Sequence, residues 1–237
     1  TIGEAYANLA GIAWAFDHDL DKTADLLEQA TRLDPWNLEI LGFARDFARA
    51  IGDLQTSVKL GQLILLRDPL CTGCRAQLAG TLECLGKREA AERELRVLDR
   101  GDSTARFALN LAKLRLQAGD MTAARAYLER VESHAQQLAG EAMLEQYQGN
   151  SEAAAALMDE LAELDPARHW MLQASTAAML GDNDVAMERL ELGAAAQFVF
   201  AQGLICEAGP WNALRQRQDW QALMTALGRN PDGSQAV

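Results

Sequence analysis

A short turn containing glycine recurs along the chain at a nearly constant spacing. The turn glycines are Gly52, Gly86, Gly119, Gly149 and Gly181, and the intervals between them are 34, 33, 30 and 32 residues. A period of this length indicates that one small unit is repeated and stacked, because a single unit cannot bury its apolar face alone. The recurrence therefore favours an array of stacked units.

A second landmark recurs between these turns. Asp-Pro pairs lie about 17 residues beyond a turn position, at Asp34-Pro35, Asp68-Pro69 and Asp165-Pro166. Glycine commonly ends a helix, and proline cannot continue one. Each unit is therefore predicted to contain two helices, the first ending at the turn glycine and the second before the proline.

Apolar residues recur at helical spacing almost throughout, as in Leu78, Leu82 and Leu85, whereas strand-like alternation is scarce. The predicted fold class is all-α, a right-handed α-solenoid of about six helix pairs with a C-terminal helical cap. We expect the array over residues 1–198, with units near 4–35, 36–69, 70–103, 104–134, 135–166 and 167–198. Capping helices are expected over 199–228 and a flexible tail over 229–237.

Small residues occupy the positions at which the two helices of each unit should cross. Two helices approach closely only where such residues lie at their contact. The crossing positions are Gly11, Arg45, Ala79, Ala112, Ala142 and Ala174 on the first helices and Thr23, Ser57, Ala91, Ala124, Ala154 and Ala186 on the second. One turn later, a larger residue that fills the space between units is expected at Leu27, Gly61, Leu95, Leu128, Met158 and Leu190. Arg45 and Gly61 depart from this pattern, so the second unit is expected to be kinked or loosely packed.

By these residues the chain resembles tetratricopeptide repeat proteins over roughly residues 4–198. Trp170 occupies the consensus tryptophan position, Leu111 and Ala112 reproduce a Leu-Gly pair, and His18 stands where the first turn glycine is expected. The resemblance implies a non-catalytic scaffold whose first helices line a concave groove for a peptide or protein. The Lys and Asn series with which some family members bind chaperone C-termini is missing, so capture of such tails is not expected.

A narrower resemblance involves two stretches, residues 15–35 and 210–228. These look like the tetratricopeptide tails of bacterial multidomain regulators, in which the array follows a nucleotide cyclase, winged-helix or TolB-like domain. The terminal pattern is carried by Trp211, Leu214, Arg215, Trp220 and Leu223. The resemblance implies the docking or regulatory region of a larger bacterial protein.

The aromatic residues near the C-terminus have two possible roles. Phe198, Phe200, Trp211 and Trp220 could cover the open end of the solenoid, which must bury its last apolar face. The same residues could instead form a dimer face, which would make the chain a self-association module.

Polar residues of the first helices are the candidates for partner binding. Arg106, Asn110, Lys113 and Gln117 follow the spacing i, i+4, i+7 and i+11, which places them on one stripe of a helix. Comparable positions are held by Glu39, Asp46 and Arg49 in the second unit and by Asn8 in the first. A merely solvated face is the alternative interpretation of each.

The formal net charge of −12 opposes nucleic-acid binding, which draws on lysine and arginine to neutralise phosphates. Apolar runs fall well short of the roughly 18 residues of a membrane helix, and the sequence from Thr1 lacks the pattern of a signal peptide. We expect a soluble cytoplasmic chain whose partner is a protein or peptide, with a homodimer as a further possibility.

Cys71 and Cys74 form a Cys-x-x-Cys pair, which can indicate zinc, redox chemistry or two small residues at a helix start. Zinc needs four ligands, and Cys84 lies ten residues from Cys74, about 15 Å along the same helix. Thioredoxin-type chemistry needs a βαβ context that the sequence lacks. Small residues at a helix start are favoured, with the thiols free as in a reducing compartment, although a reversible disulfide stays open.

Other motifs for metals, cofactors and catalysis are weak. Asp17, Asp19, Asp21 and Glu28 match four positions of a calcium loop, but Lys22 stands where that loop needs glycine, so helix capping is the preferred interpretation. The three histidines share no recurring offset with cysteine, aspartate or serine, and no phosphate-binding or dinucleotide motif is present. We therefore expect no metal, no cofactor and no catalytic residue.

Overall fold

The computed structural model of the protein describes residues 1–17, 19–101, 107–196, 210–230 and 232. Twelve helices within these ranges form six pairs: α1 (Ile2–Ile12) with α2 (Leu20–Leu33), α3 (Leu38–Ala50) with α4 (Leu54–Arg67), α5 (Thr72–Cys84) with α6 (Arg88–Gly101), α7 (Ala108–Gln117) with α8 (Met121–Leu128), α9 (His134–Tyr147) with α10 (Ser151–Ala162), and α11 (Pro166–Leu180) with α12 (Asn183–Ala196). The π-helix η1 (Ala13–Asp17) continues α1, and η3 (Pro210–Ala213) and α13 (Gln218–Ala226) follow the sixth pair. The all-α prediction is confirmed.

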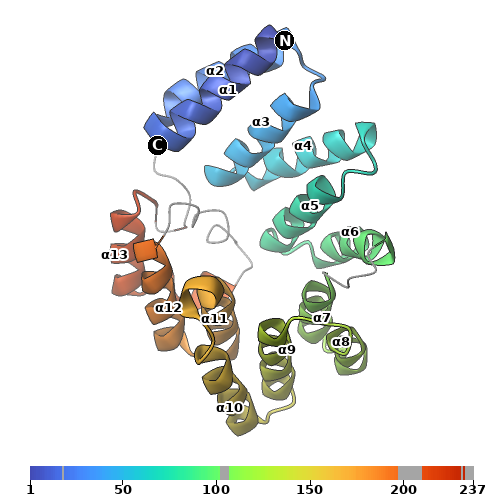
Figure 1. The fold of residues 1–237 in the computed structure, drawn as a ribbon, viewed down its shortest axis with the longest axis vertical. Helices are drawn as coiled ribbons and strands as arrows, with labels where there is room; N and C mark the ends of the chain where they lie inside the picture. The colour runs from blue at the N-terminus through green and yellow to red at the C-terminus, as the bar shows by residue number, and fades with distance from the viewer. Residues whose placement is uncertain (18, 102–106, 197–209, 231, 233–237) are drawn as a thin grey trace.

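The pairs follow one another around a curve (Figure 1). The first helices α5, α7 and α9 lie on its inner side, and their partners α6, α8 and α10 lie on its outer side. Successive first helices pack on one another, as α1 does on α3, α7 on α9 and α9 on α11. The fold is therefore a helical solenoid whose inner side is formed by the first helix of each pair.

Glycine ends the first helix of five pairs in the way the sequence predicts. Gly52, Gly86, Gly119, Gly149 and Gly181 have φ values of 87°, 69°, 78°, 85° and 88°. This left-handed conformation carries no steric cost for a residue that lacks a Cβ atom. The turns thus recur where glycine, which adopts this conformation without strain, recurs in the sequence.

Aspartates next to these turns begin the second helices. The side chain of Asp19 accepts a hydrogen bond from the Lys22 N–H at 2.9 Å, and that of Asp53 accepts one from the Thr56 N–H at 3.0 Å. Each bond satisfies a backbone donor that the first turn of a helix leaves free. Capping therefore explains the acidic residue at position 19, as expected from the sequence.

The crossing positions of the second helices are buried in all six pairs. Their exposed fractions are 1% or less, at Thr23, Ser57, Ala91, Ala124, Ala154 and Ala186. The small side chains allow the two helices of each pair to touch along their length. The core is consequently a continuous series of helix contacts running from one end of the array to the other.

We expected the second unit to be kinked or loosely packed, and the structure shows that it is neither. Both α3 and α4 run unbroken through Arg45 and Gly61. A Cβ atom at Gly61 would lie 3.8 Å from Arg45 Cδ, and Arg45 is only 7% exposed. The large residue therefore fills the space that the glycine leaves, so the two departures compensate one another.

The C-terminal helices close the far end of the array. Trp211 and Trp220 are 2% and 0% exposed, and their stacked rings lie 6.4 Å apart in one cluster with residues of α11 and α12. Arg217 joins these elements, with Nη2 lying 2.8 Å from both Asp184 Oδ1 and Asp219 Oδ2. Both indoles are thus used within the chain, and a dimer face built on them would first have to expose them. Phe198 and Phe200 lie outside the described residues.

Cys71 and Cys74 are joined by a disulfide, with their Cα atoms 5.3 Å apart. Cys71 caps α5, because its Sγ accepts a hydrogen bond from the Cys74 N–H at 3.3 Å. The expectation of free thiols at these two positions is therefore wrong, and no cysteine in the described ranges is a free thiol.

Candidate partner-binding groove

The predicted groove residues lie on three first helices, and the structure brings only some of them together. Asn8 on α1 and Glu39 on α3 are exposed, whereas the remaining five described residues are partly buried: Asp46 and Arg49 on α3, and Asn110, Lys113 and Gln117 on α7. Arg106 lies outside the described residues. These five side chains are therefore neither fully solvated nor part of the core.

A compact polar group surrounds Asp46 on α3. Arg45 Nη2 lies 2.9 Å from Asp46 Oδ1, and Arg45 Nε donates a hydrogen bond to the same oxygen at 2.9 Å. Burial lowers the pKa of the Arg49 guanidinium; Arg45 also lowers it, and Asp46 opposes the shift. Arginine stays charged at neutral pH even so. Asp46 thus pairs with Arg45, and Arg49 is a second cation near enough to interact with both electrostatically.

Hydrogen-bonding capacity in this region is left unused. Arg45 Nη1, Arg49 Nε and Gln77 Oε1 are buried and have no hydrogen-bond partner in the part of the chain that the structure describes. Arg49 Nη2 lies 4.0 Å from the place of a Cβ atom on Gly80, so the guanidinium lies against α5, the helix that carries Gln77. We call Arg45, Asp46, Arg49 and Gln77 the α3–α5 polar cluster.

Two members of the α3–α5 polar cluster were not predicted as binding residues. Arg45 was noticed only as a departure from the small-residue pattern, and that departure was the signal that could have identified it. Gln77 carries no comparable signal, because a glutamine on a helix surface is ordinary. The burial of its side-chain oxygen without a hydrogen-bond partner becomes visible only in the folded structure.

The fourth unit adds a polar stripe on α7. Asn110, Lys113 and Gln117 are each partly buried on this helix, two pairs further along the array than α3. Within the described residues Lys113 forms no ion pair, so its ammonium group can meet a partner's acceptor. The inner helices α3, α5 and α7 therefore offer cationic and amide groups in succession.

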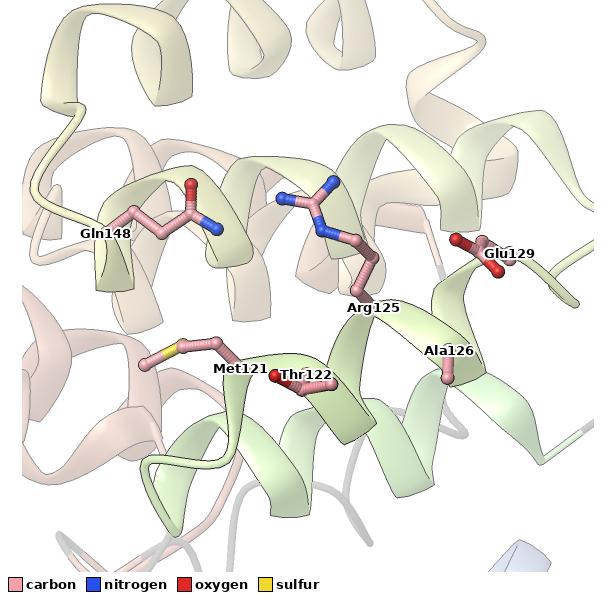
Figure 2. A pocket seen from close by; sticks show the side chains of 6 residues that line it. All are labelled: Met121, Thr122, Arg125, Ala126, Glu129 and Gln148. Atoms are coloured by element: carbon pink, nitrogen blue, oxygen red, sulfur yellow. The ribbon is translucent and has the colours of Figure 1, made fainter.

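A shallow hollow lies between α8 and the end of α9 (Figure 2). Its volume is about 450 Å³, and it is lined by Met121, Thr122, Arg125, Ala126, Glu129 and Gln148. In Figure 2 the α8 side chains and Gln148 come from two facing helix segments. Binding sites for small molecules are usually enclosed, whereas this hollow is open to solvent.

Metal and membrane sites find no support in the described ranges. Within them, no three His, Cys, Asp or Glu side chains gather in a way that could hold a metal ion. The described helices are also too short or too polar to cross a membrane.

Solved structures of several proteins share this fold. A tetratricopeptide repeat protein from Parabacteroides merdae is 20% identical, with a TM-score of 0.62 over 96% of this chain and 94% of that one. PilW, a widely conserved type IV pilus biogenesis factor, is 16% identical, with a TM-score of 0.56 over 82% of this chain and 93% of its own. PilF of Pseudomonas aeruginosa is 17% identical, with a TM-score of 0.54 over 80% and 89%.

No family model and no curated protein matches the sequence. At 20% identity or less, these likenesses show the fold and leave the partner undefined. The chain has the tetratricopeptide-repeat fold.

Proposed function

We propose that this protein is a non-catalytic scaffold that binds an extended peptide or protein segment along α3, α5 and α7. It would serve as the docking or regulatory region of a larger bacterial protein. The observation that carries the proposal is the set of partly buried polar side chains on the inner helices, with Asp46 and Arg49 on α3 and Asn110, Lys113 and Gln117 on α7. A partly buried charge interacts more strongly with an opposite charge than a fully solvated one does, so a segment that supplies carboxylates gains affinity there.

The chemistry of the cluster defines what the partner should carry. Arg49 and Lys113 are partly buried cations that only donate hydrogen bonds, whereas the partly buried Gln77 amide can donate and accept. A carboxylate is the strongest acceptor for a guanidinium, and a peptide N–H can serve the glutamine. The expected ligand therefore contains an acidic side chain within an extended segment.

The segment should extend past the neighbouring unit. Arg49 and Lys113 lie on α3 and α7, two pairs apart in the array. A second carboxylate further along the segment would pair with the Lys113 ammonium group.

The net charge of −12 acts against this ligand at long range. Repulsion between an acidic protein and an acidic peptide is screened beyond about 8–10 Å in ordinary salt, whereas contacts in a partly buried site are screened less. Binding should therefore depend on the local cluster, and added salt should speed association.

The proposal can be tested by selecting peptides from a random 12-residue display library on the immobilised protein. Recovered sequences should be enriched in Asp and Glu, and an Arg49→Gln, Lys113→Gln variant should bind them at least about ten-fold more weakly. Arg125→Gln is the matched control, because it removes an exposed arginine from α8 on the outer side. Equal binding by all three proteins would show that the inner helices are not the binding surface.

A further inference from the structure

The disulfide between Cys71 and Cys74 lies at the first turn of α5, where the chain is open to solvent. Both cysteines are half-buried, whereas Leu70, Thr72 and Gly73 beside them are exposed. The Cβ position of Gly73 has none of the described atoms beyond its immediate surroundings within 4 Å. The bond therefore bridges an accessible turn and is not enclosed in the core.

The same turn of the second unit shows that the fold does not need cysteine here. Asn37 and Ile40 lie 34 residues before Cys71 and Cys74, one repeat earlier. The Ile40 N–H donates to Asn37 Oδ1 at 3.3 Å, the same distance at which the Cys74 N–H donates to Cys71 Sγ. Asparagine is among the best helix-capping residues, and sulfur is a weak acceptor. Helix capping therefore does not explain the cysteine pair.

Holding the array together does not explain the disulfide either. The bond joins two residues that are three apart in the sequence, and both belong to the first turn of one helix. A disulfide stabilises a fold more when it closes a longer loop. This one connects no two units, so its chemistry is a better guide to its role than its effect on stability.

Reduction of the bond would leave a thiolate in a favourable place. Cys71 is the N-cap of α5, where free backbone N–H groups and the positive end of the helix stabilise an anion. The Arg75 guanidinium donates from Nη2 to the Pro69 carbonyl at 3.0 Å, which places a cation beside the same turn, although Glu94 pairs with it. Cys71 is therefore the better thiolate, and Cys74 is the second cysteine that exchange needs.

We propose that Cys71 and Cys74 form a reversible thiol–disulfide exchange site. The thiolate of an external thiol attacks Cys71 Sγ and forms a mixed disulfide, and the bond to Cys74 breaks so that Cys74 leaves as a thiolate. A second external thiolate then attacks the external sulfur of the mixed disulfide and releases Cys71. Two electrons thus pass from two external thiols, which become a disulfide, and their two protons go to the cysteine pair.

This chemistry does not depend on the βαβ context of thioredoxin. It needs an accessible sulfur, a stabilised thiolate and a second cysteine within reach, and the first turn of α5 offers all three. Glutathione and a protein dithiol supply the same thiolate chemistry. The external reductant is therefore defined as a thiol, and the experiment separates these two sources.

Peptide mapping of the whole folded chain tests the proposal. The protein is equilibrated with glutathione at rising ratios of reduced to oxidised form, or with a reduced thioredoxin, and is then quenched with acid and alkylated. Trypsin cleaves after Arg67 and Arg75, and the peptide of residues 68–75 holds these two cysteines and no other. The pair should pass from oxidised to reduced along one of the two series, and the faster reductant identifies the source of the thiol.

Far-ultraviolet circular dichroism of the same samples shows whether the helices persist. Reduction of the pair while the helices are retained would support the exchange site. A pair that stays oxidised with both reductants, or that is reduced only when the helices are lost, would overturn it.

Single-cysteine variants test the role of Cys71. Cys74→Ser leaves the Cys71 thiol and Cys71→Ser leaves the Cys74 thiol, and each variant is treated with oxidised glutathione. Cys71 should form the mixed disulfide at least about ten-fold faster than Cys74, read from the added mass on the peptide of residues 68–75. In urea, where the helix is lost, the two rates should become alike.

Equal rates in the folded variants, or a faster reaction of Cys74, would overturn Cys71 as the exchanging cysteine. None of these outcomes depends on peptide binding to the α3–α5 polar cluster.

Discussion

Two glycines buried inside helices should respond in opposite ways when each is replaced by alanine. Gly61 in α4 has room for a Cβ atom, because the nearest atoms would be Leu78 Cδ1 at 3.4 Å and Leu78 Cβ at 3.5 Å. These are ordinary van der Waals distances. Gly61→Ala should therefore raise the free energy of unfolding by about 1 kcal/mol, the gain in helix propensity.

Gly140 in α9 has no such room. A Cβ atom there would lie 2.3 Å from Leu128 Cδ2 and 3.1 Å from Leu109 Cδ1, and both leucines are 6% exposed. Forcing an extra methyl into a packed core costs about 1–3 kcal/mol. Because the propensity gain is shared by both substitutions, Gly140→Ala should be less stable than Gly61→Ala by about 1–3 kcal/mol.

Urea unfolding followed by far-ultraviolet circular dichroism measures this difference, with unchanged slopes showing that the midpoints are comparable. Gly42→Ala is the control for propensity alone, since no atom lies within 4 Å of its Cβ position. If Gly140→Ala were as stable as Gly61→Ala, α9 could not pack on α7 and α8 as closely as described.

Three further predictions concern the ends of the array and the disulfide. Trp220→Ala should lower the free energy of unfolding, measured by urea titration, by about 3–5 kcal/mol because the indole is fully buried. A loss below about 1 kcal/mol would contradict the role of Trp220 as a cap. Replacing Cys71 and Cys74 together by serine should cost about 2 kcal/mol for so short a loop, and an unchanged urea midpoint would contradict it. The pKa of Asp219 is held below its ordinary value of 3.8, chiefly by hydrogen bonding to Arg217, so its stabilisation is present above that value and lost as pH falls through the folded pKa. Asp219→Asn should therefore lower the melting temperature at neutral pH but not in strong acid, and an equal loss in both would refute the pairing.

The sequence predicted the fold because its landmarks act locally. A glycine at positive φ ends a helix wherever it stands, and the turn spacing of Gly52, Gly86 and Gly119 therefore determined the repeat. The positions at which the two helices of each unit cross were predicted from the same repeat spacing. Their burial depends on helix geometry alone, which is the same in every unit.

The groove could be predicted only in part, because its chemistry depends on contacts between units. Arg45 and Asp46 are neighbours in the sequence, but the burial of Arg45 beside Gly61 of α4 and the place of the Arg49 guanidinium beside Gly80 of α5 arise only when the helices come together. Arg45 and Gly61 lie on two helices, and the large side chain of one compensates for the missing side chain of the other. In the sequence, each of them appeared only as a departure from the repeat pattern. The disulfide was missed because spacing alone cannot show whether two thiols are oxidised.

Amide hydrogen exchange with and without a selected acidic peptide tests the central claim most directly. Binding along the inner helices predicts slower exchange in α3, α5 and α7, with α4, α6 and α8 unchanged. Protection confined to α8 and the end of α9, or no protection in α3 and α5, would contradict the claim that the α3–α5 polar cluster binds the partner.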